Sequence, residues 1–233
     1  MSNSVISSSR VRNQIVLPSL DLTFNSIVNV PVANAGSVSD WNTFFNMSTN
    51  ALTSFSSVAI NGNKVSLYGG TGLNVASSKF ANNLNIISVE DDETIGTLGL
   101  GVFNGASNLT TAILPVLRNV TGNAPFNNCI SLTTLTIPLL SGTTTNFCFG
   151  CTSLQNIIAP SLVNVAASSF RNCSSANVIT LPVCGSLGGS TINNNVFTGI
   201  SGRNITLTIS TAIATDQDVT ALQSINTVNL ILV

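Results

Sequence analysis

Apolar positions recur at fixed distances from four prolines in the middle of the chain. The prolines follow one another at intervals of 23, 22 and 22 residues and are Pro115, Pro138, Pro160 and Pro182. Apolar residues stand six, three and one positions before each proline and two positions after it: Leu109, Ala112, Leu114, Leu117; Leu132, Leu135, Ile137, Leu140; Leu154, Ile157, Ala159, Leu162; Ala176, Ile179, Leu181, Cys184. A period in the low twenties is typical of a solenoid, because one such coil buries its apolar side only by stacking on its neighbours.

The positions between these apolar residues predict a short strand in every coil. Strand residues alternate between two faces, so the residues four and two positions before each proline should point outward. Proline ends each strand because it has no N–H to donate to a neighbouring strand. The predicted outward residues are Thr111, Ile113, Thr134, Thr136, Asn156, Ile158, Val178 and Thr180.

Each coil opens with a corner motif of the form Phe-x-Asn-Cys. It is clearest in Phe126–Cys129 and Phe170–Cys173, and a weaker copy begins at Phe80. One coil departs from the motif, because Cys148 takes the Phe position with Phe147 and Phe149 on either side. The Phe and the Cys of the motif provide one large and one small apolar side chain for the core, and its Asn can form hydrogen bonds with the backbone of a turn. A buried corner in every coil is therefore expected.

The full pattern Phe-x-x-Cys-x-x-Leu-x-x-Leu-x-Ile-Pro-x-x-Leu-x-x-Val resembles the BspA-like (Treponema pallidum-type) class of leucine-rich repeats. The resemblance covers about half of the chain and rests on four repeats. It implies a leucine-rich-repeat solenoid of mainly short parallel β-strands, with loops, turns and few short helices. Known members of this class are mostly surface or secreted proteins of adhesion and interaction, so the resemblance implies a function of that kind.

The pattern divides the chain into three parts. Residues 1–79 are predicted to form an N-terminal arm and cap with degenerate repeats, residues 80–204 the solenoid, and residues 205–233 a C-terminal cap. The segment from Gln14 to Leu20 echoes the end of a coil and suggests a degenerate repeat there. Residues 1–14 are polar and are expected to form a loose arm.

Local signals predict the elements of the N-terminal cap. Asn61-Gly62 separates two apolar runs and predicts a hairpin, since both residues accept a positive φ. Asp40 precedes Trp41, Phe44 and Phe45 and is expected to cap a short helix whose aromatic residues close the end of the core. In the first part of the solenoid, the acidic run 90–93 predicts an exposed loop rather than a calcium site, because adjacent carboxylates lack the spacing of a dedicated loop.

The C-terminal part reads as two strands around a helix. Residues 205–209 alternate as a strand and residues 228–232 repeat that pattern. Between them, residues 215–218 have the spacing of a capping box and predict the start of a short helix. Val219 and Leu222 should form its buried side.

The chain carries very little charge. Charged residues make up 6% of the sequence and the net charge is −1, against about 25% in ordinary globular proteins. Since charge suppresses association, such a surface is expected to be covered by partners. The scattered basic residues exclude a nucleic-acid stripe. Polar residues interrupt every apolar stretch and exclude membrane insertion, and no export signal is visible near Arg10 and Arg12.

The chemistry-bearing residues predict no enzyme, no cofactor and no metal site. The chain has no histidine, which excludes Ser–His and Cys–His mechanisms. Cys129, Cys151 and Cys173 share one repeat position, so they are expected to form a buried, reduced ladder up the solenoid. A disulfide within the ladder is the first alternative, and metal or redox use of Cys148 and Cys151 is the second.

The predicted outward residues include no charge and no aromatic ring. A sugar site normally needs aromatic platforms, so this face suits a dry protein contact or reflects strand propensity alone. Two functions are expected. The first is a structural or interaction component of a larger assembly, most concretely a phage virion protein (capsid decoration, fibre or tail-associated piece), with virion subunits or further copies of itself as partners. The second is a bacterial cell-surface adhesin of the BspA-like kind.

Overall fold

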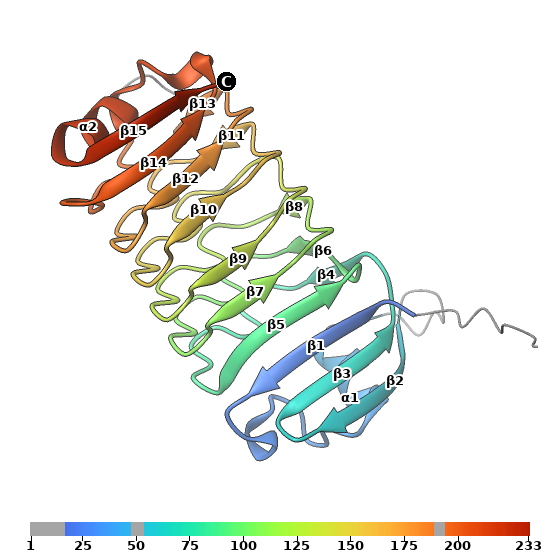
Figure 1. Cartoon of the computed structure of the whole chain (residues 1–233). Coiled ribbons are helices and arrows are strands. Elements are labelled where there is room, and N and C mark those ends of the chain that lie inside the picture. Colours follow the sequence, from blue (N-terminus) through green and yellow to red (C-terminus); the bar gives the residue numbers. More distant parts are fainter. Residues whose placement is uncertain (1–16, 48–53, 189–193) are drawn as a thin grey trace, which may run out of the picture.

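The computed structural model describes residues 17–47, 54–188 and 194–233. The chain winds into a solenoid whose strands follow one another along its length, from β2 and β3 at one end to β15 at the other (Figure 1). The predicted leucine-rich-repeat solenoid of short parallel strands is confirmed. The predicted arm at residues 1–14 lies outside the described residues.

The first half of the elements leads from the N-terminal end into the coils. They are β1 (Ser19–Phe24), η1 (Ile27–Asn29), α1 (Val38–Phe44), β2 (Phe55–Asn61), β3 (Lys64–Gly69), β4 (Leu73–Val75), β5 (Ile86–Asp92), β6 (Ile95–Leu98), β7 (Thr111–Ile113) and β8 (Asn119–Val120). The second half continues the coils to the C-terminus. These elements are β9 (Thr134–Thr136), β10 (Asn156–Ile158), β11 (Asn164–Val165), β12 (Val178–Leu181), β13 (Ser186–Leu187), β14 (Asn204–Ile209), η2 (Thr211–Ile213), α2 (Gln217–Ile225) and β15 (Thr227–Leu232).

The strands form two main sheets and two small ones. The main sheets have the orders β2-β3-β1-β5-β7-β9 and β10-β12-β14-β15, and the small ones are β4-β6-β8 and β11-β13. The pairs between successive coils are parallel, and all except β4–β6, which has a register shift after Leu73, are in register, as in Ser88–Thr111–Thr134. Parallel pairing in register places equivalent residues of successive coils side by side, as the repeat predicts.

The predicted inward residues form one continuous core. All of them are buried except Leu135 on β9, which is half-buried. Ring contacts follow the core from Trp41 through Phe45, Phe80, Phe103, Phe126, Phe147 and Phe170 to Phe197. The predicted aromatic closure of the N-terminal end is confirmed, since Trp41 and Phe45 are buried there.

One ring of this stack is turned. Phe80 and Phe103 lie parallel, with centroids 5.4 Å apart and planes at 8°. Phe147 stands at 70° to Phe126 and at 76° to Phe170. The backbone register gives Cys148 the corner position, so Phe147 reaches the core from one residue earlier and meets its neighbours edge-on.

The corners are joined by backbone hydrogen bonds between successive coils. Ala124, Phe126 and Asn128 donate their N–H groups to the carbonyls of residues 145, 147 and 149 at 3.0, 3.0 and 2.7 Å. In every corner the residues two before and two after the Phe position have positive φ; they are Ser78, Asn82, Gly101, Gly105, Ala124, Asn128, Asn146, Gly150, Ser168, Asn172, Asn195 and Gly199. Two left-handed residues thus set the same tight path in each coil.

Asparagine and glycine alternate at the second of these positions. Asn82, Asn128 and Asn172 are followed, one coil later, by Gly105, Gly150 and Gly199. A Cβ atom built on Gly150 would lie 2.5 Å from Oδ1 of Asn128, and the other two pairs are at least as close. Each Asn side chain therefore occupies the space that a side chain of the next coil would need.

The cysteine ladder lies inside the corners. Cys129, Cys151 and Cys173 are buried and unpaired with one another, and their Sγ atoms donate to backbone carbonyls at 3.1, 3.1 and 3.3 Å. The predicted buried alignment in successive coils is confirmed. Burial raises the pKa of the Cys129 and Cys173 thiols well above the ordinary value, so these groups remain protonated.

The N-terminal end differs from the predicted degenerate repeats. β1 pairs antiparallel with both β3 and β5, so Ser19 and Leu20 are not the end of a coil, and residues 14–16 of the predicted repeat lie outside the described residues. The predicted hairpin is confirmed, but its turn is Gly62-Asn63 rather than Asn61-Gly62, because Asn61 is the last residue of β2 and pairs with Lys64. Gly62 takes the positive φ of 60° that this turn requires.

The helix α1 is confirmed, but its cap is a different residue. The hydroxyl of Ser37 accepts the N–H of Asp40 at 3.1 Å and donates to the Asp40 carboxylate at 2.8 Å. Asp40 is therefore the third helical residue, which bonds the cap through its carboxylate, and is not the cap itself. At the other end of the chain, Asp216 caps α2 by accepting the N–H of Asp218 at 2.8 Å. Val219 and Leu222 are buried, as predicted.

The acidic run is not an exposed loop throughout. β5 extends to Asp92, and its alternation turns Asp91 inward, where it is 5% exposed. The Asp91 carboxylate accepts the N–H of Thr94 at 3.0 Å and that of Ile95 at 2.9 Å, closing the turn into β6. Loss of hydration on burial outweighs these bonds and raises the pKa of Asp91 to about 6.

Candidate protein-interaction surface

The eight predicted outward residues lie on one surface, which we call the strand face. Thr111 and Thr134 are register neighbours, as are Ile113 and Thr136. Asn156 pairs with Val178, and Ile158 with Thr180. The structure therefore places all eight in two rows that run along the solenoid. Their role in binding remains a prediction.

The two rows continue beyond the predicted residues. Ser88 and Glu90 on β5 precede them, with the Ser88 hydroxyl 3.1 Å from the Glu90 carboxylate. Thr206 and Thr208 on β14 and then Asn229 and Ile231 on β15 follow them. The sequence pattern missed these positions because their strands lie outside the regular proline spacing. Among the row positions from β5 to β15, Glu90 is the only charged residue, and its register neighbour on β1 is Asp21.

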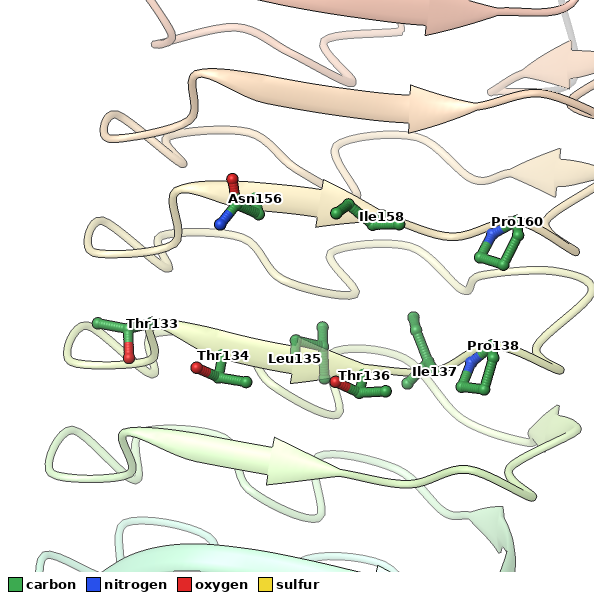
Figure 2. A pocket seen from close by; sticks show the side chains of 9 residues that line it. All are labelled: Thr133, Thr134, Leu135, Thr136, Ile137, Pro138, Asn156, Ile158 and Pro160. Atoms are coloured by element: carbon green, nitrogen blue, oxygen red, sulfur yellow. The ribbon is translucent and has the colours of Figure 1, made fainter.

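The strand face is interrupted between β9 and β10. β9 is the last strand of the six-stranded sheet and β10 the first of the four-stranded sheet, so no pairing joins these two consecutive strands. The interruption opens a groove of about 320 Å³ that runs along the two strands (Figure 2). Its lining residues are Thr133, Thr134, Leu135, Thr136, Ile137 and Pro138 on one wall and Asn156, Ile158 and Pro160 on the other.

The backbone of both walls is turned toward this groove. Thr134 donates its N–H to Thr110 at 3.2 Å, and Thr136 accepts from Leu114 at 2.9 Å, so the N–H and C=O of Leu135 point the other way, toward β10. On the opposite wall, Ala159 donates to Thr180 at 3.1 Å. The N–H and C=O groups of Asn156 and Ile158 therefore point toward β9.

Three irregularities meet at this junction. The coil that contains β10 is the first with 22 rather than 23 residues, and it is the coil in which Cys148 takes the corner position and Phe147 supplies the ring. The strand of this coil, β10, does not pair with the preceding strand, β9. The sequence carried signals for the first two irregularities, in the proline spacing and in Cys148. It carried none that distinguishes a paired from an unpaired strand.

Other kinds of site find little support in the part of the chain that the structure describes. No group of three or more Cys, Asp or Glu side chains is arranged to hold a metal ion there. Within residues 17–47, 54–188 and 194–233, no helix has the length and apolar character needed to cross a bilayer. The arrangement of the strand face is suited to contact with another chain, through side-chain rows and an open strand edge.

Comparison with known proteins gives one family and one solved structure. The family model for the BspA type Leucine rich repeat region matches in six copies, over residues 73–200 and 145–230. A crystal structure of the T. pallidum leucine rich repeat protein (TpLRR) is similar over 53% of this chain and 64% of that chain, at 20% identity and a TM-score of 0.45. The match thus spans less than two thirds of the length of that protein. A search of curated proteins gives no match. Because the family model covers well over half of its residues, this chain belongs to the BspA-type leucine-rich repeat family.

Proposed function

We propose that this chain is a non-enzymatic protein-interaction module that binds another protein with its strand face. Leucine-rich-repeat solenoids of this family typically serve protein interaction rather than catalysis. The observation that carries the proposal is the composition of the two rows across β7, β9, β10 and β12. They hold Thr, Ile, Val and Asn only, on rigid strands fixed by the parallel register.

The chemistry of the strand face favours a protein partner over other ligands. Sugar recognition uses aromatic platforms, and phosphate recognition uses Arg or clusters of backbone N–H groups. The eight residues supply neither. Uncharged hydroxyl and aliphatic side chains on a flat strand surface can be covered without stripping water from a charge, which keeps the cost of desolvation low.

The setting of this interaction follows from the family. BspA-type repeats suggest an adhesin-type function, so we propose a bacterial cell surface as the first setting to examine. The alternative setting, in a phage virion, rests on the low charge of the chain. Low charge fits any extensively covered protein, and neither the family nor the fold supports the phage setting. It therefore stays a prediction.

Site-specific cross-linking tests the proposed function. A photoreactive amino acid replaces Thr180 on the strand face, and the matched control places it at Val163, which is exposed but precedes β11 in a different sheet. Both variants are exposed to surface proteins from the source cells and to purified virions, and adducts are identified by mass spectrometry. Protein adducts at residue 180 and none at residue 163 support the proposal. Equal adducts at both positions, or none at either, contradict it.

A further inference from the structure

We propose that the coil containing β9 is a flexible joint of the solenoid, and we call residues 124–145 the joint coil. At the joint, β9 and β10 alternate between the open arrangement of this structure and a closed arrangement. In the closed arrangement they pair in register, as β7 does with β9 and β10 with β12. Such a joint goes beyond the proposed function and does not depend on it, because it concerns the motion of the solenoid and not the partner.

Neighbouring coils on either side of the joint coil are bonded on three sides. These sides are the corner, the main strand and the short strand that follows the proline. The coils before the joint coil are joined through β5–β7 and β6–β8, and those after it through β10–β12 and β11–β13. Corner bonds accompany both, from Phe80 to Val102 at 2.8 Å and from Cys148 to Ser169 at 2.7 Å. Three separated contacts hold two coils as one rigid body.

The backbone of the joint coil is bonded to each neighbour on two sides instead of three. β9 pairs with β7 of the preceding coil but not with β10 of the following coil. Behind the proline the reverse holds, since Gly142 forms a bridge with Asn164 of the following coil, whereas β8 of the preceding coil is the last strand of its sheet. A side-chain bond from Thr144 to the Gly122 carbonyl, at 2.9 Å, crosses beside β8. Corner bonds are kept at both junctions.

Two bonded sides leave one motion free. The corner and the bridge at Gly142 define a line between the joint coil and the following coil. Rotation about that line opens or closes the third side, where β9 faces β10 (Figure 2). Hinges of this kind absorb the motion in a few backbone angles, while the packed elements keep their internal structure. The two halves of the solenoid should therefore move as rigid bodies.

The facing edges already carry the groups that a closed joint needs. At two other junctions the residue before the proline donates its N–H to the next coil, from Leu114 to Thr136 at 2.9 Å and from Ala159 to the following strand at 3.1 Å. Ile137 is the equivalent donor at the joint, and its N–H has no acceptor among the described residues. Because Ile137 is buried, this unpaired N–H is unfavourable. Closing the joint brings it to the Ile158 carbonyl and gives a compensating gain.

The core beneath the gap is less completely filled than the core on either side. Leu135 on β9 is half-buried, although Ala112 and Ile157 are buried at the same inward position. A cavity of about 10 Å³ lies beneath the gap, with Leu135, Leu154 and Phe170 among its lining residues. Since close packing is favourable, closing the joint gains contacts by burying Leu135 further and filling this void.

Closing the joint changes the surface that the strand face offers. In the open arrangement its two rows are interrupted between Thr136 and Ile158. In the closed arrangement the rows continue in register across both main sheets. A protein that covers both halves of the strand face therefore shifts the equilibrium toward the arrangement that it fits.

Amide hydrogen exchange, followed by NMR on the 233-residue protein, tests the joint. The three equivalent amides are those of Leu114, Ile137 and Ala159. We expect the Ile137 amide to exchange at least about tenfold more slowly than in an unfolded chain, and at least about tenfold faster than the other two, because it is bonded only while the joint is closed. Protection equal to that of Leu114 would mean that β9 and β10 are permanently paired. No protection would mean that they never pair, and either result overturns the inference.

A reversible disulfide separates pairing from burial. Thr136→Cys with Ile158→Cys joins the two facing strands, and the matched control, Ile113→Cys with Thr136→Cys, replaces the same residue types at register neighbours on β7 and β9. Paired strands lie about 5 Å apart, which is within the Cα separation of about 4.4–6.8 Å that a disulfide requires. The native Cys129 and Cys173 are buried and their thiol pKa values are raised, so they do not compete.

The two disulfides should affect the Ile137 amide differently. Oxidation of the joint pair should raise its protection at least about tenfold, toward that of Leu114, while oxidation of the control pair leaves it unchanged. Failure of the joint pair to oxidise, oxidation without a gain in protection, or an equal gain in the control would each overturn the inference. Those results leave the proposed function standing, because cross-linking at Thr180 does not require the joint to move.

Discussion

The two sides of one junction in this solenoid behave differently. On the corner side, residues 124, 126 and 128 bond the next coil at distances within the range of the other corners. On the strand side of the same two coils, β9 and β10 share no pairing and a groove opens between them. The same change of repeat length therefore leaves the corner intact and separates the strands.

The difference shows which side determines the stacking of coils. The backbone path of each corner depends on two residues with positive φ and on a buried ring. These features belong to the coil itself and do not require pairing with a strand of the next coil. The strand depends on a partner for its hydrogen bonds, and only three residues per coil take part. The corner side can thus be regarded as the structural spine, and the strand side as the part that is free to serve binding.

The strongest test of this comparison removes core side chains from each side. Phe126→Ala deletes a fully buried ring of the corner stack and should lower the free energy of unfolding by about 3–5 kcal/mol. Leu135→Ala acts at the half-buried strand position beside the groove and should cost about 1–2 kcal/mol. Urea denaturation followed by circular dichroism measures both. Equal losses would show that the strand side contributes as much to stacking as the corner does.

The second test adds a single methyl group to the corner side and, as a control, to a glycine outside both the corner and the strand face. Gly150→Ala places a Cβ atom 2.5 Å from Oδ1 of Asn128 at a φ of 72°, and we expect a loss of about 2–4 kcal/mol from overpacking and backbone strain. The control is Gly142→Ala, whose Cβ atom would lie 3.7 Å from the nearest atom; its effect should stay within about 1 kcal/mol. Thermal unfolding compares the two. A tolerated Gly150→Ala would mean that the Asn side chain can move aside.

The third test uses pH to probe the strand side near its N-terminal end. The pKa of Asp91 is raised to about 6 in the folded chain, above its ordinary value of 3.8, because the carboxylate is desolvated. Between pH 3.8 and about pH 6, Asp91 is protonated in the folded chain but ionised in the unfolded chain. The free energy of unfolding is therefore highest at low pH and falls as the pH rises through about 6. We expect a fall of about 1–3 kcal/mol between about pH 4 and pH 7 from this group.

The contribution of Asp91 is isolated by comparison with Asp91→Asn. Burial also raises the pKa of Asp216, which adds a change of the same sign in both proteins. The difference between the two curves of unfolding free energy against pH therefore reports Asp91 alone. Asp92→Asn, at the exposed neighbour on the same strand, serves as the comparison and should change the curve far less, because the Asp92 charge is the weakest of the influences on the pKa of Asp91. A wild-type curve in Asp91→Asn would contradict the assignment.

The smallest effect on stability is expected on the strand face itself. Ile158 is 50% exposed, so Ile158→Lys should change the free energy of unfolding by no more than about 0.5 kcal/mol. The adjacent Ile157→Lys buries a charge and should destabilise the fold severely. Thermal denaturation distinguishes the two variants. If Ile158→Lys also unfolds the chain, the strand face is part of the stabilising core and is not free for a partner.

Much of this architecture could be predicted from the sequence because it depends on local patterns. The proline period, the alternation around it and the corner Phe residues determine the strands, the core and the ring stack. The antiparallel β1 could not be predicted in the same way, since the apolar spacing before Leu20 is the same in either strand direction. Asp91 was detectable in principle, because alternation from Val89 turns it inward. The groove exists because the strands of two neighbouring coils do not pair. The sequence of a single coil does not determine whether its strand pairs with the next one, so the groove could not be predicted.

The alternation of Asn and Gly along the corners limits how many coils can be removed from this solenoid without disturbing its packing. Removing one coil, for example residues 129–150, would bring Asn128 against Asn172, two side chains in a space that holds one. Removing two coils would leave an Asn facing a Gly, as before. The corner packing of this solenoid is therefore kept only when coils are removed or added in pairs.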